Sequence, residues 1–193
     1  LAEVAFEGVP ERRHLPHMRV QAKSHASIQG YELDILEKAW KDMQHCGVIF
    51  CSRQHENAFE GATEAPAGRV PKKNPDRTIS SEGRTINDMR LANLAGHKYD
   101  HPPATQARHR QVARLAIWWS VRHPGVAKVI TKRDVSRTFK WTRIKPEDVK
   151  DFIVPIHGHG ISMYPEILIV SLIMPFGWNG APGEYMVQAW GAK

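Results

Sequence analysis

The sequence has few cysteines and no long apolar run. Cys46 and Cys51 are the only thiols among the 193 residues. Two thiols cannot cross-link a domain of this size, so we expect a reducing, intracellular compartment, either the cytoplasm or the nucleus. They also supply too few ligands for a structural zinc site. The longest apolar stretch, residues 167–176, is interrupted by Ser171 and Pro175. It is too short to cross a bilayer, so we expect no membrane partner.

The sequence also lacks a secretory signal, internal repeats and low-complexity tracts. Its first residues, LAEVAFEGVPERRHLP, mix charged and apolar side chains, unlike a signal peptide. The chain starts at Leu1 rather than at a methionine, and it ends at Lys193 inside a segment with a helical pattern. Both ends look like cuts, and we therefore expect a fragment of a longer protein.

The composition that is present is basic. Lys and Arg number 27 against 20 Asp and Glu, which gives a net charge of +7 and a pI near 9.6. Such a balance favours acidic partners, nucleic acid first among them, although many soluble proteins are basic without a specific reason. A chain of 193 residues is about one domain and can bury a sizeable core.

The apolar spacing predicts an α+β fold in which a sheet is covered by helices. Residues 1–29 have no clear period and are expected to be extended or poorly ordered. Helices are predicted over residues 31–43, 108–122, 146–150 and 184–192, and strands over residues 48–50, 70–73, 84–90, 126–130, 152–156 and 167–173. The turn at residues 74–76 makes residues 70–90 a hairpin, and residues 139–144 are expected to be extended.

Asp134 is a candidate metal ligand because it follows the apolar pair Val129-Ile130 at a predicted strand end. Polymerases join nucleotides with two divalent ions. Hard ions such as Mg²⁺ take oxygen ligands, and carboxylates are common among them. Taken alone this signal is weak, since a lone Asp at a strand end is usually a turn former or a solvated charge.

Two further groups of residues could contact phosphates. Residues 173–182 join a predicted strand to a helix, and their glycines would let the backbone approach a ligand closely. Lys72, Lys73 and Arg84 flank the predicted turn, and a hairpin would bring these cations to one side. Each group has a plainer interpretation, as an ordinary strand–turn–helix and as a solvated charged hairpin.

The order and spacing of three blocks are more specific than any block alone. The blocks are VPKKNPD…GRTINDMRLAN, then KRDVSRTFKW, then MPFGWNGAPGEYM. In this order they closely resemble the fingers and palm motifs of reverse transcriptases, best those of retroelements and retroviruses. Asp88, Arg90 and Asn93 match a fingers pattern, the block around Asp134 matches motif A, and the block around Gly177 matches motif B.

The resemblance covers about residues 30–193 and implies a fold and a division of the chain. The fold would be the fingers and palm of a right-hand polymerase, with a mixed, mostly antiparallel sheet covered by helices, truncated at its end. Residues 1–29 would be a lead-in, residues 30–125 a fingers-like region, and residues 126–193 a partial palm with motifs A and B. The activity implied is that of an RNA-directed DNA polymerase.

The resemblance also implies site residues. Asp134 would be the first catalytic aspartate and a ligand to both metal ions, and Val135 would add a carbonyl ligand. Lys73, with Lys72 left open as the alternative, would grip the incoming triphosphate together with Arg84. The remaining nucleotide contacts would be backbone amides at Ser136, Arg137 and Thr138, the aromatic steric gate Phe139, and the motif B residues Phe176 and Gly177.

The implied partners are an RNA or DNA template with its primer, a deoxynucleoside triphosphate (dNTP), and two Mg²⁺ or Mn²⁺ ions in the complete domain. The family's motif C, an aromatic-x-Asp-Asp hairpin, does not occur before Lys193. We therefore expect the chain to be inactive by itself.

Several features depart from the family pattern or have a second interpretation. Arg137 stands where an acidic or small residue is common, and residues 75–83 lengthen the hairpin. His157-Gly158-His159 is interpreted as an ordinary loop rather than a metal site. The tryptophans Trp118, Trp119 and Trp141 are expected in the core rather than as base-stacking platforms.

Two other functions stay open. One is a non-catalytic, nucleic-acid-binding remnant of a decayed or domesticated retroelement. The other is a structural or interaction domain whose motif matches arise by chance.

Overall fold

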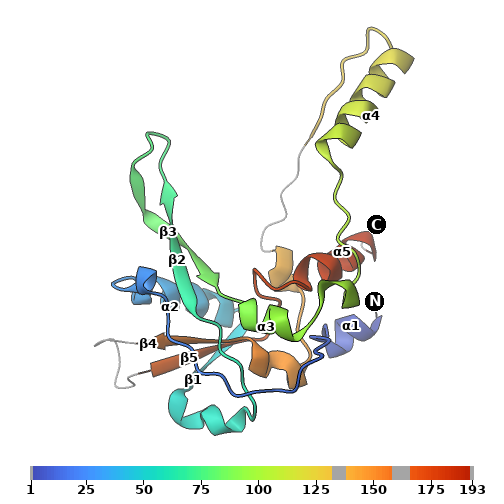
Figure 1. Ribbon diagram of the computed structural model, residues 1–193. Coiled ribbons are helices and arrows are strands. Elements are labelled where there is room, and N and C mark those ends of the chain that lie inside the picture. The colour runs from blue at the N-terminus through green and yellow to red at the C-terminus, as the bar shows by residue number, and fades with distance from the viewer. Residues whose placement is uncertain (1, 132–137, 158–165, 192–193) are drawn as a thin grey trace.

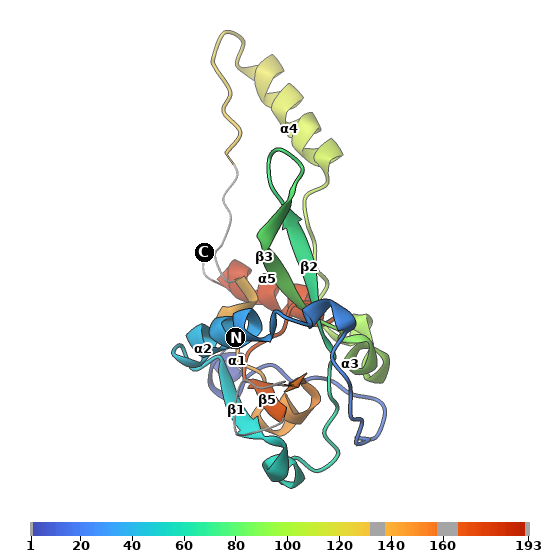
Figure 2. The ribbon, with the colours of Figure 1, turned by 90° about the vertical axis from the view of Figure 1, so that its left-hand side faces the viewer.

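The structure, a computed structural model, describes residues 2–131, 138–157 and 166–191 (Figure 1). Its fold is α+β and combines small antiparallel sheets with helices. One sheet and most of the helices form a body. A β-hairpin and an arm that contains a single helix project from this body on the same side in both ribbon views (Figures 1 and 2).

The sheet of the body has three antiparallel strands in the order β1-β5-β4. These are β1 (Val48–Ser52), β5 (Glu166–Ser171) and β4 (Ile153–His157). The central strand β5 pairs Ser171 with Val48 on one side and Val170 with Ile153 on the other. Because both faces of β5 are covered, its sequence EILIVS has four consecutive apolar residues instead of an alternation.

Two apolar clusters cover the two faces of this sheet. The larger cluster joins Ile156 and Ile169 to Ile35 and Ala39 of the helix α2 (Glu32–Met43). Its further buried members include Val9, Phe152, Met174 and Trp178. The smaller cluster contains Ala62, Ile153, Leu168 and Val170 on the other face. Alternation along β4 and β5 sends successive side chains into the two clusters.

The lead-in segment runs along the body and is tied to it at several points. It starts with α1 (Ala2–Glu7) and continues through isolated bridges that pair Val9 with Ile144, Arg13 with Gly96, and Val20 with Thr63. Val9 and Glu11 are fully buried. Backbone bridges and two buried side chains therefore hold the lead-in segment on the body. Hydrophobic periodicity in the sequence does not predict either feature.

The projecting hairpin consists of β2 (Ala67–Lys73) and β3 (Ile79–Asn87). Val70 lies opposite Arg84, and the register shifts between Pro71 and Lys73. Pro71 has no N–H to donate, and a proline in a strand is typical of an edge or a bulge. The chain then enters α3 (Arg90–Ala95), which packs near the start of α5 (Ala181–Gly191).

The arm contains α4 (His109–Arg122) and the segment that returns from it. None of the residues of α4 is buried. Figures 1 and 2 both show the helix at the far end of the arm, away from the sheet. Five short 3₁₀ helices complete the described chain, over Ala26–Ile28, Arg53–Ala58, Lys98–Asp100, Thr138–Trp141 and Pro146–Asp151.

Most of the predicted elements are confirmed with small shifts at their ends. The confirmed helices are those predicted at residues 31–43, 108–122, 146–150 and 184–192, and the confirmed strands are those predicted at residues 48–50, 70–73, 152–156 and 167–173. The predicted turn at residues 74–76 also lies at the tip of the hairpin, where the Arg77 N–H donates to the Asn74 carbonyl at 2.9 Å.

Three predictions about elements are wrong. Residues 126–130 form no strand, because no strand of the described chain lies beside them; they run back along α4 instead. Residues 138–141 form a 3₁₀ helix rather than an extended segment, since spacing within six residues cannot separate the two. The second hairpin strand spans residues 79–87 instead of 84–90, and α3 begins at Arg90.

The expectation that the tryptophans lie in the core is also wrong. Trp118 and Trp119 are half-exposed on α4, and Trp141 is exposed beside the body. A tryptophan is usually well buried, but within the described ranges the groove of α4 is covered by the returning segment alone. In the part of the chain that the structure describes, no helix is long and apolar enough to cross a membrane.

Candidate functional site

Four of the predicted site residues, Asp134, Val135, Ser136 and Arg137, lie outside the described residues. The site is therefore built from the residues that flank them and from the two other sequence blocks. Thr138 and Phe139 begin the 3₁₀ helix η4 (Thr138–Trp141), directly after the predicted metal ligands. This helix packs against α5.

The glycine loop, residues 175–180, joins β5 to α5 and is held in part by a side chain of α3. The Asn93 side-chain amide donates to the Gly177 carbonyl at 2.9 Å, and its oxygen accepts from the Asn179 N–H at 2.7 Å. Gly177 has a φ of +100°, a conformation in which a side chain would be strained. Asn93 thus connects the fingers-like block to the motif B-like block across 84 residues of sequence.

The start of α3 is fixed by a second local interaction. The Asp88 carboxylate accepts from the backbone N–H of Arg90 at 3.1 Å and from its guanidinium at 2.8 Å. The hydrogen bond from the Arg90 side chain holds the pKa of Asp88 below its ordinary value. The Asp88 N–H in turn donates to the Pro66 carbonyl at 2.9 Å. The pattern Asp88-x-Arg90-x-x-Asn93 therefore acts structurally, by orienting α3 against the glycine loop.

An aromatic cluster lies beside the glycine loop. The Phe139 ring is 6.1 Å from the ring of Phe176 and 5.9 Å from that of Tyr185, which meets it edge to face. Phe176 is 72 % exposed, whereas Phe139 is partly buried against the core. The structure thus places Phe139 beside Phe176, which precedes Gly177, and it adds Tyr185 from α5.

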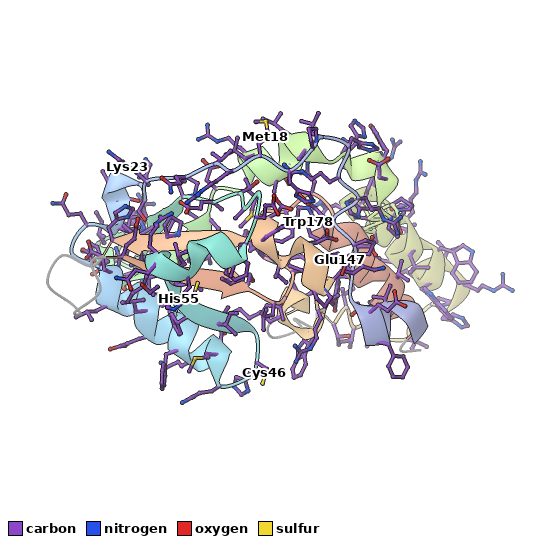
Figure 3. All side chains as sticks on the ribbon, turned by 90° about the horizontal axis from the view of Figure 1, so that it is seen from below. Met18, Lys23, Cys46, His55, Glu147 and Trp178 are labelled. Atoms are coloured by element: carbon purple, nitrogen blue, oxygen red, sulfur yellow. The ribbon has the colours of Figure 1, made fainter. Side chains whose placement is uncertain are left out.

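The glycine loop and the start of α5 rest on a buried polar pair. His101 Nδ1 lies 2.9 Å from Glu184 Oε1, and both side chains are less than 5 % exposed. Trp178 packs edge to face on His101 at 4.9 Å and on Phe152 at 5.3 Å. A Cβ at Gly183 would lie 1.8 Å from the Pro102 carbonyl oxygen, so only glycine fits there. Figure 3 shows Trp178 among the elements of the body, whereas Met18 and Cys46 lie at its edge.

The hairpin cations are exposed and differ in their partners. Lys72 pairs with Glu82 at 2.7 Å, and this hydrogen bond keeps the pKa of Glu82 low. Lys73 and Arg84 have no carboxylate partner among the described residues. Val70 lies opposite Arg84, so strand alternation places Lys72 on the face of Arg84 and turns Lys73 to the opposite face. The structure therefore does not bring Lys73 and Arg84 together on one face.

A second cluster of charged groups lies away from the glycine loop, in the body. Glu11 is fully buried, and Arg13 Nη1 lies 3.4 Å from its Oε1 and 2.8 Å from Asp151 Oδ1. The Asp148 carboxylate accepts from the Glu11 N–H at 2.9 Å. Burial raises the pKa of Glu11 to about 8, and the hydrogen bond that its protonated carboxyl makes to Asp151 acts in the same direction. Burial thus favours the neutral form of the Glu11 carboxyl.

No metal-binding group of three His, Cys, Asp or Glu side chains occurs in the described ranges. His157 lies at the end of β4 and pairs with Glu166 at 2.7 Å, while His159 lies outside those ranges. Cys46 and Cys51 are not joined in a disulfide. The predicted metal ligands Asp134 and Val135 are thus the positions on which any metal site at motif A would depend.

Sequence reasoning did not identify several residues that build the site. Asn93 was recognised as part of a pattern but not as the residue that holds the glycine loop. Tyr185 and the pair of His101 and Glu184 gave no signal, because their partners lie far away in the sequence. The glycines of residues 173–182 indicated only that a ligand could approach the backbone closely.

Comparison with known proteins adds no relative to this picture. No protein-family model matches the chain, and no curated protein matches it in sequence.

Proposed function

We propose that the chain is part of the fingers and palm of a reverse transcriptase, an RNA-directed DNA polymerase. The reaction would be nucleotidyl transfer, in which a primer 3′-hydroxyl attacks the α-phosphate of a dNTP and pyrophosphate leaves. The template would be RNA or DNA. The proposal rests on the three sequence blocks and on the way that two of them meet.

The observation that carries the proposal is the clamp between Asn93 and the glycine loop. A chance resemblance gives no reason for the fingers-like block and the motif B-like block to touch. The two hydrogen bonds of Asn93 join them at Gly177 and Asn179. The motif A-like block also reaches this place, since Phe139 packs on Phe176. The three motif matches occur in the expected order along the sequence, and residues from all three lie close together in the structure. This agreement supports a common site.

The expected metal is Mg²⁺ or Mn²⁺. The carboxylate of Asp134 and the carbonyl of Val135 are hard oxygen donors, which suit these ions. Two such ions, when bound, would activate the primer hydroxyl and neutralise phosphate charge. A pair of ions needs more carboxylates than Asp134 alone, and the 193 residues contain no adjacent Asp pair.

The chain's own residues would bind and orient the nucleotide. Arg84 and Lys73, exposed on the hairpin, would attract the triphosphate. The Phe139 ring is braced by Phe176 and Tyr185 and would leave little room for a ribose 2′-hydroxyl. The positive φ of Gly177 gives a backbone without a side chain, which a base or sugar could approach closely.

Titration of the chain with a fluorescent dNTP analogue in Mg²⁺ tests this proposal. We expect Arg84→Gln to weaken binding about fivefold, because one charge-assisted contact at an exposed site is lost. Lys73→Gln and Lys72→Gln, measured in parallel, identify the lysine that contacts the triphosphate. Lys41→Gln on α2 is the matched control and should bind as the unsubstituted chain does.

Equal affinity in all four variants and the unsubstituted chain would contradict the proposed nucleotide site. Retained binding to template RNA in that case would favour the non-catalytic, nucleic-acid-binding alternative, in which the cations serve the nucleic-acid backbone alone.

A further inference from the structure

The arm has a surface that the nucleotide site does not use. A shallow hollow of about 470 Å³ on α4 is lined by Arg114, Ile117, Trp118, Val121 and Arg122; these five residues are here called the Trp118 face. All of its lining residues belong to α4 itself. The opposite side of the helix, with Leu115 and Trp119, faces the returning residues 126–130 across a separate groove.

The Trp118 face combines an aromatic ring with two cations. Arg114, Trp118 and Arg122 are spaced four residues apart, which places them in one row along the helix. The Arg122 guanidinium carbon lies 5.3 Å from the centre of the Trp118 ring. The indole is 49 % exposed, with Arg122 over one face of its ring and Arg114 one helical turn before it. A base that replaces the Arg122 guanidinium on this face, or stacks on the other face, would therefore have a cation one turn away on either side.

The charge around this face has one sign. Residues 101–131 contain no Asp or Glu, and they carry Arg108, Arg110, Arg114, Arg122 and Lys128. The arm also projects on the same side of the body as the hairpin, which bears Lys73 and Arg84 (Figures 1 and 2). Both projections thus offer exposed cations to an anion long enough to reach them.

We infer that the Trp118 face binds single-stranded nucleic acid. A base stacks on Trp118, and the phosphates on either side of it pair with Arg114 and Arg122. Stacking needs an unpaired base, whereas the guanidinium groups need only a backbone, so the surface is selective for single strands without reading sequence. The hollow is apolar at its floor through Ile117 and Val121, which suits the face of a base.

Two other occupants fit the observations less well. An anionic membrane needs a continuous apolar face, but here Arg114 and Arg122 are interleaved with the apolar residues. A second copy of the chain would bring two arms without acidic residues together, and their charges would repel.

The inference does not depend on the proposed polymerase activity, since it needs only a polyanion and an unpaired base. Its test therefore uses single-stranded RNA without any nucleotide. Fluorescence anisotropy of the full chain with a labelled, unstructured RNA is measured at several salt concentrations. A perfectly paired duplex of the same sequence is measured alongside.

Trp118→Ala should weaken binding of the single strand about tenfold, and Trp118→Phe should restore part of the loss. Trp40→Ala, which removes a half-exposed tryptophan from α2, is the control and should leave the affinity unchanged. Binding of the duplex should depend little on Trp118, because its bases are already stacked.

The double variant Arg114→Gln/Arg122→Gln should show a weaker salt dependence. The slope of the logarithm of RNA affinity against the logarithm of salt concentration should fall by about 1.4, because each phosphate contact with a single strand contributes about 0.7. The matched control is Lys23→Gln with Lys41→Gln, which removes the same charge elsewhere. Figure 3 shows Lys23 at the end of the body opposite to the arm.

Unchanged RNA binding in Trp118→Ala and in the double arginine variant would overturn the inference. The inference would also be overturned if these variants lost binding to phosphatidylserine vesicles but kept RNA binding, which would indicate a membrane surface. A loss of self-association in sedimentation, again without an effect on RNA binding, would overturn it as well. RNA binding that depends on Arg84 and not on Trp118 would overturn it as well, while leaving the polymerase proposal in place. RNA binding that depends on Trp118, with dNTP binding indifferent to Arg84 and Lys73, would support the inference and contradict the proposed nucleotide site.

Discussion

At the scale of single residues, side chains with polar partners explain most about the site. The half-buried Asn93 holds the glycine loop, while the buried side chains of His101 and Glu184 support the start of α5 and the buried Glu11 anchors the lead-in. A buried polar group without partners is costly, so His101, Glu184 and Glu11 fix their neighbours in place. Two of them give predictions that single substitutions can check.

Asn93→Ala should loosen the glycine loop. The substitution removes two hydrogen bonds, to the Gly177 carbonyl and from the Asn179 N–H. Each contributes about 1 kcal/mol, so a loss of about 2 kcal/mol in the free energy of unfolding is expected. Hydrogen exchange at residues 177–180 should rise as well. Asn93→Asp keeps the acceptor for Asn179 but puts a carboxylate oxygen against the Gly177 carbonyl, so its loss should be at least as large. Exchange that does not change in either variant would mean that the loop is held elsewhere.

Glu11→Gln should remove a pH dependence of stability. The pKa of Glu11 is raised from 4.5 to about 8, chiefly by burial. Between these two values the folded chain holds a proton that the unfolded chain has released, so stability falls as pH rises from about 4.5 to about 8, by at most about 1.4 kcal/mol per pH unit. Thermal unfolding from pH 5 to pH 8 should therefore show a falling Tm in the unsubstituted chain and a flatter profile in Glu11→Gln.

Other charged groups lie close to Glu11 and contribute to the same pH profile of unfolding. Arg13, Asp148 and Asp151 adjoin Glu11, and His17 Nδ1 lies 3.0 Å from Asp151 Oδ2. Glu7→Gln, at an exposed position of α1, is the control and should keep the slope of the unsubstituted chain. Parallel profiles for all three proteins would show that Glu11 is ionised in the folded state.

At the scale of elements, the sequence predicted the positions of helices and strands better than their surroundings. The helix α4 was correctly placed by the spacing of Val112, Leu115 and Trp119, but the same spacing wrongly implied a buried face. Periodicity reports which residues share a side of a helix and does not report whether another element covers that side. The strand predicted at residues 126–130 failed for a related reason, because a strand is defined by a partner.

In the site, too, residues within a sequence motif could be predicted, whereas contacts between segments far apart in the sequence could not. The motif blocks implied that Phe139, Phe176 and Gly177 would each contact a nucleotide, which stays a prediction; the structure adds that the rings of Phe139 and Phe176 lie 6.1 Å apart. The blocks did not predict Tyr185, nor the separation of Lys73 from Arg84 on the two faces of the hairpin. A turn signal places two strands side by side, but the shift at Pro71 and the alternation of side chains decide which face each cation occupies.

The effects of one substitution in α4 and one in the core on the free energy of unfolding test whether the arm packs on the body. Trp119→Ala should change the free energy of unfolding of the body by less than about 1 kcal/mol, because the half-exposed ring packs, among the described residues, against the arm. Phe152→Ala, which empties a fully buried position between Trp178 and the sheet, should cost about 3–5 kcal/mol. Chemical denaturation of both variants measures the difference. Comparable losses would mean that the arm packs on the body in solution.

At the scale of the whole molecule, the chain combines an anchored body with two basic projections. The body holds the glycine loop and the aromatic cluster, and the hairpin and the arm extend from it on one side (Figure 1). The net charge of +7, and the absence of Asp and Glu from residues 101–131 of the arm, favour binding of a polyanion on that side. What the 193 residues do not contain is an adjacent Asp pair, which the proposed reaction needs beside Asp134.

This composition leads to a prediction about primer extension on an RNA template. The 193-residue chain should extend no primer, since one carboxylate cannot hold two ions in the geometry of the reaction. A longer chain that continues through an aromatic-x-Asp-Asp hairpin should extend the primer in Mg²⁺. In that longer chain Asp134→Asn should lower the rate at least about a hundredfold, whereas Asp34→Asn on α2 should have little effect. Extension by the 193 residues alone, or a longer chain indifferent to Asp134, would contradict the assignment of Asp134 as a metal ligand.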